Sequence, residues 1–218
     1  MSLPIVLALT AGVLWGLNMV ASRWGLDATG VSSDIGAFVA IATATLVAAA
    51  TAWTAGVDTA GLDAGSIGRY ALIGAIAPGA SQGIFLAAIN SIGPARTGLF
   101  IGAAPMFSVI LAMAFIGEPW RFAIIIGTLL TVAGGVIISL ERGYTDLHGF
   151  MRRGSLLALA AALAFGIRDV AARQLTVDVD VEVWWATTVI LASGALTIAV
   201  IAVSRGANLI RGTRQALP

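Results

Sequence analysis

Long apolar stretches, separated by short charged or turn-forming segments, dominate the pattern of this chain. Each uncharged run is at or near the ~20 residues that one helix needs to cross a ~30 Å hydrocarbon core. The runs also lack the polar face that a helix at the surface of a soluble protein presents to water. The pattern therefore predicts membrane-spanning helices over roughly 3–22, 34–56, 69–91, 95–116, 120–140, 154–175 and 183–204.

Proline, glycine and acidic residues mark the predicted connections between these helices. Proline lacks the backbone N–H and glycine relaxes φ, so both end helices. Such signals occur at 27–30, 58–65, 93–94, 117–119, 141–153 and 178–180. The predicted fold is all-α: a polytopic transmembrane helix bundle of about seven helices.

Composition agrees with a lipid environment. Apolar residues make up 59% of the 218 positions and charged residues 11%, whereas a soluble domain carries roughly 25% charge. The bilayer is thus the expected surrounding, and we expect a multi-pass protein of the cell membrane. The net charge of +1 comes without a basic patch, so no nucleic-acid partner is expected. Cysteine is absent, which excludes disulfides and thiolate metal sites.

An internal repeat links the first and sixth predicted helices. When Ala8–Arg23 is aligned with Ala158–Arg173, identical residues fall at several positions, and Trp15 is matched by Phe165. Alanine-rich helices can look alike by composition alone, but the shared aromatic-glycine pair and the closing Arg favour a true repeat. Because five helices precede the second copy, the two copies would have inverted topology, as in many transporters.

The repeat divides the chain into three predicted parts. Residues 1–141 form a first five-helix repeat, 142–153 a connecting loop, and 154–218 a partial second repeat of two helices and a tail. The second copy stops where an eighth helix would begin. We therefore expect a five-helix inverted repeat with an incomplete second copy, which a homodimer or a partner chain would complete.

Several of these segments resemble the EamA-type permeases of the drug/metabolite transporter superfamily. The similarity is strongest over Gly93–Leu99, Ala104–Phe107 and Phe115–Pro119, which look like the family's fourth and fifth helices, and it continues through Gly127–Gly135. Trp15–Arg23 is similar to its first helix. The resemblance implies ten helices in two inverted halves, with a small metabolite passing through a central cavity.

Polar residues at membrane depth are costly and therefore informative. Ser81 and Gln82 lie near the middle of the third predicted helix beside Pro78, and Pro105 lies in the middle of the fourth. A loosened helix frees backbone groups that a cavity or a neighbour must satisfy. Two weakened helices meeting at mid-membrane would suit a substrate site. The competing interpretation is close helix packing through the GxxxG pairs 79/83, 12/16 and 98/102.

A second set of candidates lies on the two repeated helices. Asn18 follows Trp15 by three residues, so both project from one face, where an aromatic plate beside an amide would suit a polar metabolite. Interfacial anchoring of Trp15 is the alternative. Phe165 is its counterpart in the second copy. Arg168 and Asp169 are the charges inside a predicted span, and a substrate-binding or gating role competes with snorkelling of Arg168 to the headgroups.

Other functional classes lack the residues that they need. A retinal protein requires a lysine for its Schiff base, and the chain contains none. The G-x-S-x-G match at 79–83 lies inside an apolar helix, without the strand-to-helix turn of a hydrolase. No H-E-x-x-H zinc motif occurs. We expect no enzyme, no catalytic residue, no metal and no cofactor.

The sequence thus predicts a membrane permease or exporter of a small metabolite, such as an amino-acid-like or other small polar or amphipathic solute. The alternative is a truncated, non-transporting membrane protein or a helix-packing subunit.

Overall fold

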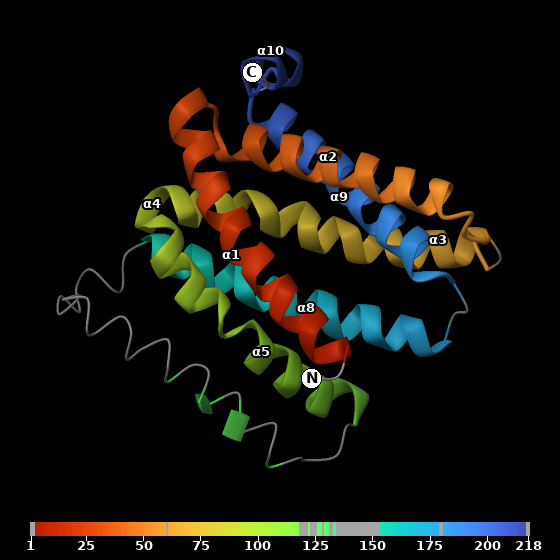
Figure 1. Cartoon of the computed structure of the whole chain (residues 1–218). Coiled ribbons are helices and arrows are strands. Elements are labelled where there is room, and N and C mark those ends of the chain that lie inside the picture. The colour runs from red at the N-terminus through yellow and green to blue at the C-terminus, as the bar shows by residue number, and fades with distance from the viewer. Residues whose placement is uncertain are drawn as a thin grey trace.

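The computed structural model describes residues 3–59, 61–117, 122, 126–127, 129–130, 133, 153–178 and 181–216. These residues form helices and turns without a strand, which confirms the all-α bundle (Figure 1). Five of the described segments are long and apolar enough to cross a membrane. The helical elements are α1 (Leu3–Thr29), α2 (Ser33–Thr54), α3 (Ala64–Gly74), η1 (Ala75–Ala80), α4 (Ser81–Ile101), α5 (Ala104–Leu111), η2 (Ala112–Ile116), α8 (Arg153–Asp178), α9 (Val183–Ser204) and α10 (Leu209–Ala216).

The first helix runs further than the apolar pattern predicted. It continues from residue 22 to Thr29, because Arg23 and Asp27 stand one turn apart and form an ion pair of 2.8 Å along the helix. Gly30, with φ of 65°, then ends it. The second helix begins close to the predicted position, where the Ser32 hydroxyl accepts a hydrogen bond from the Ile35 N–H.

The third predicted helix is a composite of three pieces. It starts at Ala64 rather than at 69, because Asp63 and Ser66 form a reciprocal capping box. Its middle, η1, is a wide π-helical turn in which Ala77 has an extended backbone (φ −148°, ψ 116°) just before Pro78. At Gly93, φ of 81° interrupts α4 at the predicted Gly-Pro connection. The predicted loosening around Pro78 is thus a real break in the helix.

The fourth predicted helix is also interrupted. The helix ends at Ile101, and α5 begins at Ala104 with Pro105 in its first turn, where a missing N–H costs nothing. The predicted fifth helix, 120–140, and the predicted loop 142–153 lie mostly outside the described residues. The tail that follows α9 contains the short helix α10.

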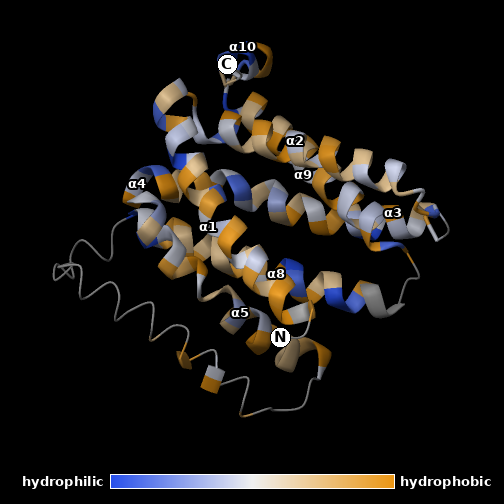
Figure 2. Ribbon diagram, viewed as in Figure 1, coloured by the Kyte–Doolittle hydropathy of each residue, from blue (hydrophilic) through white to orange (hydrophobic). Residues whose placement is uncertain are grey.

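Small residues allow the central helices to approach one another closely. The chain packs α4 along α8 and α2 along α9, while η1 lies against α9 (Figure 1). A Cβ added to Gly74 would overlap the Ile190 carbonyl oxygen, and one added to Gly194 would come within 2.6 Å of Pro78 Cγ. Hydrophobic residues, drawn in orange, predominate along α1, α2 and α9, in keeping with their length and hydropathy as candidate membrane spans (Figure 2).

Candidate functional site

Three aromatic side chains from three helices meet in the core of the bundle. Trp15 of α1 stacks on Phe85 of α4 with ring centroids 5.7 Å apart. Phe165 of α8 meets both rings edge-on at 5.9 Å. Phe85 and Phe165 are buried, at 0% and 4% exposed, whereas Trp15 remains 39% exposed. The cluster is therefore enclosed by the bundle at Phe85 and Phe165 and is accessible from outside the bundle at Trp15.

A charged pair stands next to this aromatic cluster. The Arg168 guanidinium carbon lies 5.2 Å from the centre of the Phe165 ring, within cation–π range. Arg168 also donates hydrogen bonds to Asp169 Oδ1, at 3.0 Å from Nε and 2.8 Å from Nη2. Because each charge has an opposite partner, the pair lowers the cost of holding two ionised groups in an apolar span.

Ser81 and Gln82 are both buried at the point where η1 ends and α4 begins. Ser81 lies one helical turn before Phe85, so the two residues share a face of α4. The Ser81 hydroxyl oxygen is fully buried and has no hydrogen-bond partner. An unsatisfied buried hydroxyl is destabilising by roughly 1–3 kcal/mol, so this atom is a candidate contact for a polar solute.

Two of the predicted site residues lie elsewhere. Asn18 is exposed on α1, while its predicted companion Trp15 turns into the aromatic cluster. Pro105 is exposed at the start of α5. The expectation that the two broken helices meet at a substrate site stays a prediction. The main packing partner of η1 is α9 and that of α5 is α8, and Ala77 and Ala104 belong to one core cluster. Pro105 lies in the first turn of α5, where proline is compatible with the start of a helix.

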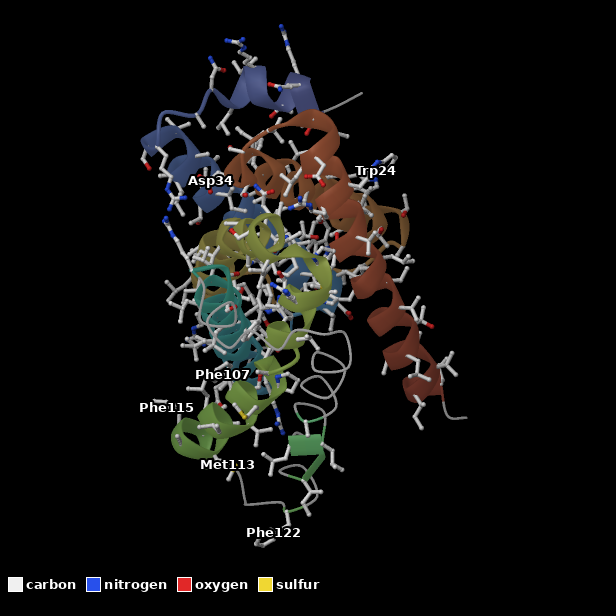
Figure 3. The ribbon with its side chains drawn as sticks, turned by 90° about the vertical axis from the view of Figure 1, so that its left-hand side faces the viewer. Trp24, Asp34, Phe107, Met113, Phe115 and Phe122 are labelled. Carbon is white, nitrogen blue, oxygen red and sulfur yellow. The ribbon has the colours of Figure 1, made fainter. Side chains whose placement is uncertain are left out.

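The pattern of apolar runs did not single out Phe85, Asp34 or Arg205. The structure places Phe85 in the aromatic cluster and pairs Asp34 with Arg205. The sequence offered one signal for Phe85: it lies one helical turn after Ser81, which had been singled out as a polar residue at membrane depth. Asp34 and Arg205 stand at the ends of predicted spans, where charges are ordinary. They nevertheless form an ion pair of 2.9 Å across 171 positions of sequence. Figure 3 shows Asp34 near the α10 end of the bundle, well away from Phe107, Met113 and Phe115.

Metal binding finds no support in the part of the chain that the structure describes. No three histidine or acidic side chains gather there in a group that could hold an ion. The side chains that do meet are the three aromatic rings and the charged pair beside Phe165, while Ser81 and Gln82 lie about one turn before Phe85 on α4.

Comparison with known proteins is consistent with this interpretation. The profile of the EamA-like transporter family matches residues 2–140. A protein of Streptantibioticus cattleyicolor described as a probable terminal-alkyne amino-acid exporter is 29% identical over 185 residues, which cover 82% of this chain and 59% of that protein. The chain thus spans about three-fifths of the relative's length. No solved structure matches the chain. Both findings point to a transporter rather than an enzyme.

Proposed function

This chain belongs to the EamA-like transporter family, and on that premise we propose that it carries a small amino-acid-like metabolite across the cell membrane. The solute would pass between two inverted five-helix repeats, the second of which includes residues 154–218. The family match and the description of the relative as an amino-acid exporter support this class of solute.

The aromatic cluster of Trp15, Phe85 and Phe165 is the observation that carries the proposal. Trp15 and Phe165 occupy equivalent positions of the two proposed repeats, and their rings are in contact. A pseudo-twofold axis brings equivalent residues together only where it passes between them. The contact therefore suits a cluster on the axis of an inverted repeat, which is where transporters of this design bind their solutes.

The surroundings of the cluster suit a small solute with both polar and apolar parts. The ring edges offer an apolar surface, and Arg168 and Asp169 offer one charge of each sign. Ser81 and Gln82, one turn away on α4, add a hydroxyl and an amide. The backbone at the η1 break leaves the regular helical pattern, as occurs at membrane depth where a protein lines a cavity.

Solute uptake into liposomes tests the proposal. The purified chain, reconstituted at a density that lets copies meet, is expected to accumulate radiolabelled amino acids above empty liposomes. Trp15→Ala is expected to lower the initial rate at least about tenfold, since it removes the open wall of the cluster. Trp24→Ala is the matched control, because Trp24 lies on the same helix but is exposed (Figure 3).

Ser81→Ala and Gln82→Leu refine the same assay. If Ser81 contacts the solute, its replacement slows transport while stabilising the protein by about 1 kcal/mol, because an unpaired hydroxyl is removed. A stabilised Ser81→Ala protein with the wild-type rate would exclude Ser81 from the site. A wild-type chain that moves no amino acid would contradict the proposed function and favour a non-transporting subunit.

A further inference from the structure

The strongest feature outside the aromatic cluster is the ion pair between Asp34 and Arg205. Asp34 lies in the first turn of α2, and Arg205 directly follows α9. Arg205 Nη1 donates to both carboxylate oxygens, at 3.0 Å to Oδ1 and 2.9 Å to Oδ2. The Asp34 side chain is 18% exposed and that of Arg205 is 64% exposed. The carboxylate is thus held inward, while the guanidinium is free to swing away from it.

A cavity of about 150 Å³ opens behind this ion pair. Its lining includes the ion pair itself, Gly79 and Gly83 from the broken segment, and the apolar side chains of Ile198 and Ile201 from α9. A cavity of this size holds a molecule about as large as benzene. It therefore joins one negative group, one positive group and an apolar wall in a space suited to a small solute.

Gly83 places the carboxylate at the cavity. A Cβ added to Gly83 would stand 2.8 Å from Asp34 Oδ1, closer than real Cβ contacts allow. Any larger residue at position 83 would therefore push the Asp34 carboxylate from its place. Gly83 and Phe85 are two residues apart and point to nearly opposite sides of α4. The cavity and the aromatic cluster thus lie on different sides of the same helix.

From this geometry we infer that the cavity binds the zwitterion of a small aliphatic amino acid, with its ammonium on Asp34 and its carboxylate on Arg205. The solute enters between the paired side chains and replaces one ion pair by two. Arginine has five N–H donors in a planar fork that matches a carboxylate. The aliphatic side chain then lies against Ile198 and Ile201.

The charge balance of the site selects for a zwitterion. Asp34 and Arg205 together carry no net charge, and a zwitterion adds none. An amine without a carboxylate would only exchange one ion pair of Asp34 for another, with the exposed Arg205 left to water, and an acid without an amine would leave the inward-held Asp34 carboxylate without a partner. Leaving one partner of a partly buried ion pair unmatched is costly. The site is therefore expected to bind the acid poorly and to gain no additional ion pair from the amine, so it favours the zwitterion over both analogues.

This inference names the solute class of the proposed transporter and rests on that function for its role in transport. Binding itself can be measured separately. Titration calorimetry of the full chain in detergent would use L-valine, isobutylamine, which lacks the carboxylate, and isovalerate, which lacks the amine. We expect L-valine to bind at least about tenfold more tightly than either analogue, as the loss of a charge-assisted hydrogen bond predicts.

Single-residue variants test whether L-valine binds in this cavity. Asp34→Asn, Arg205→Gln and Gly83→Ala are each expected to weaken L-valine binding at least about tenfold. The matched control is Gly12→Ala, because a Cβ at Gly12 meets nothing within 4 Å. Circular dichroism and gel filtration establish that each variant keeps its helices and its size. The comparison of the three ligands uses the wild-type chain and needs no variant to fold.

The outcomes separate the binding site from the transport function. Equal affinity for L-valine and its analogues, no L-valine binding by the wild-type chain, or full affinity in folded Asp34→Asn would each overturn the inference. Selective L-valine binding that these variants weaken, in a chain that moves no amino acid into liposomes, would support the site while contradicting the proposed function. Transport that is lost in Trp15→Ala but unchanged in Arg205→Gln would support the function and overturn the site.

Discussion

Two glycine pairs with the same spacing have opposite surroundings in this protein. In the α3–η1–α4 segment, a Cβ at Gly79 would stand 2.8 Å from the Gly74 carbonyl oxygen and 2.9 Å from Thr197 Cβ. In α1, Gly12 and Gly16 have nothing within 4 Å of an added Cβ. In the first pair, Gly79 allows η1 to lie against α9 and Gly83 faces Asp34 of α2, whereas the second pair lies on an open face. The GxxxG spacing permits close packing but does not cause it.

The comparison extends to whole helices. The segment from Ala64 to Ile101 is mostly buried, and it contacts α2, α8 and α9. In contrast, α1 is almost entirely exposed and is held mainly by its contact with α4. The broken segment is thus the centre of the described bundle, and both candidate binding regions lie along it. Breaks are tolerated there because neighbouring helices surround the irregular backbone.

Replacing one glycine of each pair gives the largest expected difference in stability between two matched variants. Gly79→Leu would force a side chain into Thr197 and the backbone at Gly74, which we expect to destabilise the folded chain by about 3 kcal/mol. Gly12→Leu is expected to change stability by less than about 0.5 kcal/mol. Thermal unfolding in detergent, followed by tryptophan fluorescence, measures both variants. Similar losses in both would show that the α1 pair is also packed.

Truncation of aromatic rings is expected to have an intermediate effect. Phe85→Ala removes a fully buried ring of the aromatic cluster, while Phe115→Ala removes one that is 80% exposed (Figure 3). Lipid is as apolar as the core, so mainly packing is lost. We expect about 2 kcal/mol for Phe85→Ala, below the roughly 3–5 kcal/mol of a soluble core, and almost none for Phe115→Ala. The same unfolding measurement distinguishes them, and equal losses would contradict the observed burial.

The smallest expected effect on stability comes from Asp63, which caps the start of the packed segment Ala64–Ile101. The Ser66 backbone N–H, followed by the Ser66 hydroxyl, lowers the pKa of Asp63 from its ordinary value of 3.8. A lowered pKa contributes stability that is present above pH 3.8 and is lost as the pH falls through the folded-state pKa. At neutral pH, Asp63→Ala is expected to lower the melting temperature by about 2–4 °C through loss of the cap.

Asp63→Asn is the control for the charge, because asparagine caps helices about as well as aspartate. It should keep the melting temperature at neutral pH and reduce its fall between about pH 5 and pH 3. If Asp63→Asn kept the full acid dependence of the wild type, the carboxylate would have no part in it.

Features that depend on neighbours along the chain could be predicted from the sequence. The apolar runs gave the spans of α2 and α9 within two residues, because length and hydropathy are properties of one segment. Pro78, Gly93 and Pro105 marked the three breaks, since each acts on its own backbone. The extension of α1 past residue 22 was not predicted, although the ion pair of Arg23 with Asp27 that accompanies it is equally local, since the two charges lie one helical turn apart.

Features that depend on which helix faces touch could be predicted only in part. Trp15, Phe165 and Ser81 were singled out by residue type and by repetition, and the structure places them at or beside one cluster. That the two weakened helices meet at a substrate site stays a prediction, although Ala77 and Ala104 share one core cluster. A soluble helix reveals its buried side by its apolar face, but a helix in lipid is apolar all round. The sequence therefore could not say that α5 turns toward α8.

The sequence by itself determined that this is a helical membrane protein with breaks at defined residues and with aromatic residues at matching positions of two similar helices. Only the tertiary structure decided that Trp15, Phe85 and Phe165 share one cluster and that Asp34 meets Arg205 across 171 positions. Helix formation and helix breaking depend on local backbone chemistry. Contacts between distant side chains depend on how the helices cross, and this follows from small residues such as Gly74 and Gly194 that let particular pairs approach.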